Sequence, residues 1–329
     1  MSPPIDPVWI ARTENLEFRF GPFNLGTFQF KALSLLSNPF VVDPNLGVPF
    51  KKAVAMGTEG VVKYAKPISE DFATFRIEGG ALRYATRYGV RCVIDLDGSF
   101  AEYLKKFSGG SRNRLRRTVK KSLAGSAAPA AVREYCTPSE IRTFRDIAIG
   151  ISRHSYKTER GWGFPEEESF ARQLEIDAGA GAVRGYVLIL DGQPAAYRYC
   201  RIEHDVILDK HTGYDEKFSL RSPGTVLLYI VLERLFEEGR FRLLDFDGTE
   251  YFAFKEFFAT RMIKCARVIW FRPTFRNFTL VSAHWAVTAG WRCGAALYNL
   301  TRRRDGRWLS VRRLPRRWVR VLTKAQPSR

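Results

Sequence analysis

The sequence predicts an α+β fold, and three observations lead to this prediction. From Val132 onward, apolar alternation and helical periodicity follow one another in the order β-α-α-β-β-β-α-β-α-β. Asp191-Gly192 separates two of the expected strands, and this dipeptide is a strong hairpin signal. An apolar helix opens at Ser222-Pro223 and stops at Gly239, with a proline in its first turn and a glycine just past its end.

Composition narrows the class of protein. The chain has 329 residues, enough for two domains, and a hydrophobic fraction of 45% that supports a packed core. Its five cysteines are scattered without a CxxC pair, which predicts reduced thiols in a cytosolic compartment. The cysteines and the four histidines lack metal-site spacing, so no metal is expected, and residues 1–10 do not read as a signal peptide.

The charge is strongly basic and unevenly distributed. The net charge is +19, and residues 301–329 hold eleven basic residues against one acid. A second basic cluster lies at 112–121. Such a surplus suits nucleic acid, an anionic membrane or a phosphorylated substrate, and the alternative is a basic surface that is merely solvated.

The N-terminal portion reads as strand-weighted. Segments 54–56 and 61–64, separated by two glycines, predict a hairpin. Segments 72–77 and 91–96 predict further strands. A basic amphipathic helix follows over 111–123, with its Leu and Val residues on one stripe.

The later elements can be placed one by one. A strand at 132–136 precedes a capped helix from Thr137 to about residue 156, and another helix opens at Phe164. The remaining expected strands cover 184–190, 195–202, 205–214, 241–246 and 265–271. An acidic turn follows the strand at 241–246, and a further helix start follows that turn.

This order, with several short motifs, resembles the GNAT acyltransferase fold. Gly213-Tyr214-Asp215, Ser222-Pro223-Gly224, Asp245-Phe246 and Lys255 look like the CelD-like branch, which is tied to cellulose and exopolysaccharide biosynthesis and is related to FemAB peptidyltransferases. The basic helix after Val93–Leu96 is also similar to FemAB-type chains. The resemblance is best over residues 100–256.

The resemblance implies tandem GNAT-like units and an N-acyltransferase activity. Residues 1–105 would be a degenerate GNAT-like unit, 106–275 the acyltransferase domain, and 276–329 an amphipathic helix with a basic tail. The donor would be acetyl-CoA or another acyl-CoA, and the acceptor an amino group of a sugar or cell-envelope precursor. The family's Gly-rich pyrophosphate signature is reduced here to Arg221-Ser-Pro-Gly224.

The start of the helix at residue 222 is the expected donor cradle. Ser222, Gly224 and Thr225 can offer backbone N–H groups to a phosphate, and Arg221 can add charge. The alternative is an ordinary helix start without a ligand.

The acidic turn after the strand at 241–246 is the expected source of the base. Asp245 is the first candidate, with Asp247 and Glu250 as possible substrate contacts. Strand alternation would place Asp245 and Asp247 on one face, where like charge could raise one pKa. The alternative is ordinary turn chemistry at Asp-Gly.

Four further side chains are candidates. Tyr251 could protonate the leaving thiolate, and Lys255, four residues later on the same helix face, could hold an acceptor anion. His211 is a second possible base, and strand alternation would place it with Asp209 and Gly213. Tyr214 could contact the substrate; a structural histidine, a surface lysine and a turn tyrosine are the alternatives.

The C-terminal region offers a partner surface. Segment 278–300 is apolar but contains His284 and Arg292, so a helix on an anionic inner membrane face is expected rather than a spanning one. The alternative is a helix packed on the domain. Two rival functions stay open: a FemAB-like transferase that uses aminoacyl-tRNA, and a non-catalytic GNAT scaffold of an envelope-synthesis complex.

Overall fold

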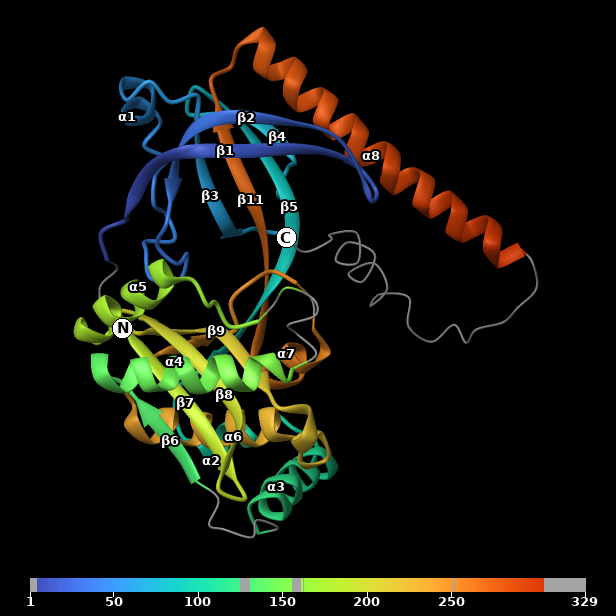
Figure 1. The fold of residues 1–329 in the computed structure, drawn as a ribbon. Helices are drawn as coiled ribbons and strands as arrows, with labels where there is room; N and C mark the ends of the chain where they lie inside the picture. The colour runs from blue at the N-terminus through green and yellow to red at the C-terminus, as the bar shows by residue number, and fades with distance from the viewer. Residues whose placement is uncertain (1–4, 125–130, 156–160, 162, 251, 305–329) are drawn as a thin grey trace. The chain divides into compact units, whose positions relative to one another are not determined.

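The computed structural model describes residues 5–124, 131–155, 161, 163–250 and 252–304. The chain forms two compact units (Figure 1). Unit 1 comprises residues 92–247 and 258–261, and unit 2 comprises, within the described residues, 5–91, 248–257 and 262–304.

The sheet of unit 1 is mainly antiparallel. Its strands lie in the order β10–β9–β8–β7–β6, and only the pair β10–β9 is parallel. The last residues of β5 (Ala81–Asp95) pair antiparallel with β10. The other strands are β6 (Ala131–Tyr135), β7 (Val183–Leu190), β8 (Gln193–Glu203), β9 (Val206–Tyr214) and β10 (Leu243–Asp245).

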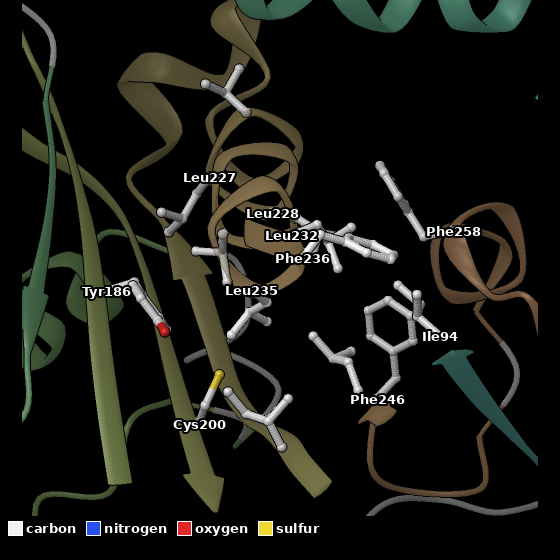
Figure 2. Close-up of a cluster of buried hydrophobic side chains, with 14 of the residues drawn as sticks. Ile94, Tyr186, Cys200, Leu227, Leu228, Leu232, Leu235, Phe236, Phe246 and Phe258 are labelled. Atoms are coloured by element: carbon white, nitrogen blue, oxygen red, sulfur yellow. The ribbon is translucent and has the colours of Figure 1, made fainter. Parts of the chain in front are cut away.

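Helices bury both faces of this sheet. On one face, α6 (Pro223–Glu238) packs its leucines and valines against the strands, together with α2 (Phe100–Leu104) and α3 (Gly109–Ala124). Figure 2 shows leucines of α6 converging with Tyr186 and Cys200 of the strands and with Phe246 and Phe258. On the other face lie α4 (Pro138–Arg153) and α5 (Glu168–Gly179), with an aromatic core.

A β-bulge divides β9. Asp209 pairs with Cys200 and His211 pairs with Tyr199, so Lys210 is an extra residue with no opposite number on β8. Adjacent residues of a strand point to opposite faces. Asp209 therefore lies on the face of Cys200, which α6 covers, and His211 lies on the face of Tyr199, which α4 and α5 cover. The expectation that the two residues share a face is wrong, because the bulge inverts the alternation.

The strands of unit 2 lie in the order β1–β2–β3–β11–β5, with β4 paired to β5. One face carries α8 (Phe275–Arg304), and the other carries α1 (Phe50–Ala55). The strands are β1 (Trp9–Phe20), β2 (Phe23–Leu35), β3 (Gly60–Pro67), β4 (Phe75–Glu78) and β11 (Arg261–Phe271), and residues 248–257 add most of α7 (Ala253–Phe258).

A buried carboxylate anchors the sheet of unit 2. Glu14 accepts hydrogen bonds from Ser34 and Arg12 on Oε1, and from Tyr64 and Arg267 on Oε2. Only 4% of its side chain is exposed. Burial alone would raise the pKa of Glu14, but these donors lower it below its usual value.

The order of elements from β6 to β11 is the one predicted. One expected strand is wrong: residues 54–55 lie in α1 rather than in a hairpin with β3. The local sequence favours this helix, because the segment follows Pro49 and contains two lysines and two alanines, which are good helix formers. β3 pairs instead with β2 and β11.

The compact units do not end at the predicted domain boundaries of 105/106 and 275/276. Unit 1 begins at residue 92, and residues 262–275 belong to unit 2. That the N-terminal portion is a degenerate GNAT-like unit stays a prediction. In the described part of the chain, no helix is long and apolar enough to span a bilayer.

Candidate functional site

The parallel strands β9 and β10 of unit 1 are paired over only a short stretch and then diverge. They pair only from Val206 with Leu243 to Leu208 with Asp245. Beyond that point, within the described residues, 209–214 of β9 have a strand neighbour only on the β8 side. The other edge of this part of β9 has no strand neighbour among the described residues, and an extended ligand with amide groups can add to a strand edge of this kind.

The start of α6 adds a strained backbone position in the same unit. Ser222, the N-cap residue, has φ 50° and ψ 49°, a left-handed conformation that costs a non-glycine residue about 1 kcal/mol. Its hydroxyl does not cap the helix, because no hydrogen bond joins it to the first turn. Strain of this kind clusters at ligand sites, so Ser222 is a candidate binding position.

The backbone donors at this helix start are few. Pro223 has no N–H, and the N–H groups of Thr225 and Val226 both donate to the Ser222 carbonyl, at 3.0 and 3.1 Å. The Gly224 N–H has no acceptor in the described part of the chain. Among the expected cradle donors, Gly224 is therefore the one whose N–H the fold leaves for an anion.

Arg221 lies at the end of the 3₁₀ helix η2 (Glu216–Arg221), next to this start. Its guanidinium donates to Asp191, at 2.7 Å, and to the backbone oxygen of Ser122 in α3. Arg221 thus ties the hairpin turn between β7 and β8 to the end of α3. The structure gives it a positioning role, and contact with a ligand stays a prediction.

Tyr214 closes the group around α6. A Cβ added at Gly224 would lie 3.7 Å from the Tyr214 ring, an ordinary contact distance. The end of β9 and the first turn of α6 are therefore neighbours. The structure brings together Tyr214, Arg221, Ser222, Gly224 and Thr225, five of the residues that the sequence singled out.

The acidic turn has a different geometry from the expected one. β10 ends at Asp245, whose side chain is fully buried and accepts the N–H of Asp247 at 3.0 Å. Asp247 lies past the strand end with φ 43°, so strand alternation does not relate the two carboxylates, and the expectation of a shared strand face is wrong. Asp247 is partly exposed and pairs with Lys210 at 2.7 Å. This ion pair joins the bulge of β9 to the end of β10, just beyond the last backbone pair.

The sequence reading missed Arg198. It donates from Nη1 to Asp209 Oδ2 in an ion pair whose side chains are 1% and 4% exposed. Asp209 Oδ1 and Arg198 Nε are buried without a hydrogen-bond partner among the described residues. An arginine between two tyrosines in an apolar strand was the available signal. Asp209 is also the first residue of β9 beyond its pairing with β10.

His211 lies on the opposite face, in an aromatic group. Its ring stacks on Tyr199 at 6.0 Å and meets Phe164 and Phe170 edge-on at 5.6 and 6.0 Å. Burial raises the pKa of Tyr199, and it raises that of the neighbouring Tyr197 to about 12. Both phenols therefore stay protonated at neutral pH.

The remaining candidates belong to unit 2. The Lys255 ammonium lies 5.3 Å from the centre of the Phe252 ring. The carboxylate of Glu250 and the Lys255 ammonium both lie near Gly248, 2.6 and 3.7 Å from where its Cβ would be. α7 begins at Ala253, and Tyr251 lies outside the described residues, so a shared helix face for Tyr251 and Lys255 stays a prediction.

Comparison with known proteins now decides the class of unit 1. Residues 109–256 match the model of the acetyltransferase (GNAT) domain. These residues carry a GNAT acetyltransferase domain. The predicted GNAT fold is thereby confirmed, and the domain supports an acyltransferase that uses an acyl-CoA. None of the curated proteins matches the chain in sequence.

Several solved structures resemble the fold of this chain. The structure of FemX is 12% identical, with a TM-score of 0.51, and the match covers 83% of this chain and 90% of FemX. The C-terminal domain of a putative lysylphosphatidylglycerol synthetase from Agrobacterium fabrum is 12% identical, with a TM-score of 0.49, covering 79% and 84% of the two chains. A tandem GNAT protein from the clavulanic acid biosynthesis pathway is 16% identical, with a TM-score of 0.38, covering 82% and 83%. The likeness to FemX is one of fold.

Proposed function

We propose that the chain is an N-acyltransferase that moves an acetyl group from acetyl-CoA to an amino group of a sugar or cell-envelope precursor. The observation that carries the proposal is the early divergence of β9 and β10 in the domain that holds the first turn of α6. The edge of β9 offers main-chain partners to the amides of the donor's extended arm. The Gly224 N–H and the positive end of the helix dipole attract its phosphates.

The chemistry asks three things of the side chains. The amine nitrogen attacks the thioester carbon, a C–N bond forms, and the C–S bond breaks. A carboxylate takes the amine proton: Asp247, which is partly exposed, is the accessible candidate, and the fully buried Asp245 positions it by accepting its N–H. The thiolate needs a proton in return, and Tyr251 is the proposed donor.

The other candidates keep supporting roles in this proposal. Lys255 and Glu250 contact the acceptor, and Tyr214 lines the donor site. His211 is an alternative base on the face of α4 and α5. The acceptor class comes from the CelD-like resemblance, which ties the chain to exopolysaccharide synthesis at the cytoplasmic side of the envelope.

Thermal stabilisation of the full chain by acetyl-CoA tests the donor. A ligand at 100 times its Kd stabilises a protein by about 2.7 kcal/mol, so the melting temperature should rise with acetyl-CoA concentration. Gly224→Val should remove this rise, because its branched side chain fills the space at the cradle beside Tyr214. Gly224→Ala is the matched control, because its Cβ makes only an ordinary contact. A wild-type chain that shows no rise at millimolar acetyl-CoA would refute the proposal.

A second candidate function is transfer of an aminoacyl group from tRNA. The basic face of α3 favours it: Arg114, Arg117, Lys120 and Lys121 are exposed, and the helix contains no acid. The slope of binding affinity against salt concentration would report the number of phosphate contacts. Tight tRNA binding with a steep slope, lost on reversing the charge of these residues, would favour this function. A non-catalytic scaffold would bind neither donor.

A further inference from the structure

The tip of the β1–β2 hairpin in unit 2 exposes large apolar side chains. Phe23 is 67% exposed, Leu25 62% and Phe20 40%. The turn between the strands, Gly21-Pro22, and the residues around it carry no charge from Phe20 to Phe30. An exposed apolar turn of this kind costs solubility and indicates an interaction surface.

Contacts with α8 fix the position of the hairpin tip. Trp291 of α8 lies over Gly21, where a Cβ would come within 2.5 Å of the indole, and it meets Phe20 edge-on at 5.3 Å. Gly21 has φ 63°, which also favours glycine. Figure 1 shows the tip of the hairpin beside α8 within this unit.

A recess of about 360 Å³ lies between the hairpin and α8. Its lining is almost wholly apolar, with Thr27 as the one polar side chain of the set. The lining residues are Phe18, Leu25, Gly26, Thr27, Phe28, Leu280 and Val287. Leu25 thus belongs to both the recess and the exposed tip, so the two form one continuous apolar surface, called here the hairpin–α8 surface.

The segments that form this surface carry a surplus of positive charge. The segments 18–42 and 272–304, which supply the hairpin, the strand after it and α8, contain no Asp or Glu. They contain eight cations: Arg19, Lys31, Arg272, Arg276, Arg292, Arg302, Arg303 and Arg304. Arg276 also lies 5.3 Å from the centre of the Phe28 ring, beside the recess. Two of these cations have acidic partners, Arg19 with Glu17 at 2.7 Å and Arg276 with Glu59 at 3.4 Å, so the segments keep an excess of positive charge beside an apolar patch. This combination complements a bilayer with anionic headgroups.

We propose that the hairpin–α8 surface docks on an anionic membrane. Phe23 and Leu25 enter the hydrocarbon boundary, lipid chains fill the recess, and Arg276 and Arg292 of α8 meet the headgroups. The proposal does not depend on the acyltransferase activity. It differs from attachment by the basic tail alone, because it requires the apolar hairpin tip.

Vesicle sedimentation with the full chain tests the proposal. The probes are vesicles of phosphatidylcholine alone and vesicles that also contain phosphatidylglycerol. Wild type should bind the anionic vesicles and leave the neutral ones largely free. Phe23→Ser with Leu25→Ser should weaken this binding by about tenfold or more, because two exposed apolar side chains no longer enter the bilayer. Ile176→Ser is the matched control, because Ile176 is 65% exposed on α5 of unit 1.

Three outcomes would overturn the proposal. The first is wild type that stays in the supernatant with both kinds of vesicle. The second is binding that persists at full strength in the double variant, which would assign it to the basic tail. The third is a dimer, seen by light scattering, that the double variant abolishes while neither form binds vesicles, which would make the surface an interface between copies of the chain.

Discussion

Each unit buries one arginine–carboxylate pair in its sheet, and the two pairs are completed to different degrees. In unit 2, both oxygens of Glu14 are used, by four donors from four residues. In unit 1, Asp209 uses one oxygen, for Arg198, and its Oδ1 has no partner among the described residues. Both carboxylates are about equally buried, with side chains 4% exposed.

This difference in hydrogen bonding distinguishes a network that stabilises the fold from a pair that belongs to a binding site. A buried charge is tolerated when its hydrogen bonds are complete, and Glu14 meets that condition. Asp209 does not meet it, and it lies where β9 loses its β10 neighbour, in the domain that binds the donor in the proposed function. We infer that Glu14 contributes to stability and that Asp209, whose hydrogen bonds are incomplete, contributes to the donor site.

The largest expected effect comes from removing the complete network. Glu14→Leu with Arg267→Met should lower the free energy of unfolding by about 3–5 kcal/mol, because Ser34, Tyr64 and Arg12 lose their buried acceptor. Urea unfolding followed by tryptophan fluorescence measures this, since Trp9, Trp270, Trp285 and Trp291, four of the seven tryptophans, lie in unit 2. Lys264→Met, which breaks the exposed pair with Glu70, is the control and should cost under about 1 kcal/mol. A loss below that control would contradict the assignment.

Lys63, a buried cation of unit 2, should have an effect of intermediate size on how the free energy of unfolding depends on pH. The Lys63 ammonium donates to the Leu46 carbonyl at 2.6 Å, and burial lowers its pKa to about 8, with Lys66 nearby as a lesser cause. Between pH 8 and the ordinary value of 10.5, the unfolded chain holds a proton that the folded chain has lost. The free energy of unfolding should therefore rise as pH rises through this window, by roughly 2 kcal/mol.

Urea midpoints at pH 7.5 and 9.5 measure that rise. Lys63→Met should flatten it, because the variant has no ammonium to bury. A wild-type profile that falls over the same interval, or a variant whose profile keeps the full rise, would show that Lys63 is not the group responsible.

The smallest stability effect is expected for the incomplete pair. Arg198→Met with Asp209→Leu should change the free energy of unfolding by no more than about 1 kcal/mol, because apolar residues replace the pair without leaving donors unpaired. Circular dichroism during urea unfolding measures it. The same variant should lose its stabilisation by acetyl-CoA. Either single substitution should be worse for stability, by about 3–5 kcal/mol, because it leaves one buried charge alone.

Two results would contradict the inferred difference between the two buried pairs. A double variant of unit 1 that is as unstable as that of unit 2 would make Asp209 structural. A double variant that binds acetyl-CoA as wild type does would remove the pair from the donor site.

The sequence was informative where local signals agree with tertiary packing. The capping box at Thr137, the turn at Asp191-Gly192 and the stop at Gly239 each specify local backbone, and the structure has all three. The order of elements in the GNAT domain followed from them. The short helix α1 was missed because six residues carry too little periodicity to distinguish helix from strand.

The candidate site was less predictable, because it depends on pairing partners. Nothing in the sequence around Lys210 marks a bulge, since the extra residue is defined only by its register with β8. The role of Arg198 could be recognised only from the structure, because its partner Asp209 lies on another strand. The positions near α6, which follow each other in the chain, were the ones that local reasoning could gather.

The bulge at Lys210 has a consequence for how β9 tolerates change. Before it, odd-numbered positions such as Ile207 and Asp209 lie toward α6; after it, odd-numbered positions such as His211 and Gly213 lie toward α4 and α5. A systematic substitution scan along β9 should thus show an alternating profile whose parity reverses at residue 210. Deleting that single residue would remove the bulge and leave every position beyond it on its present face, because Asp209 and His211 would then be successive residues of a regular strand.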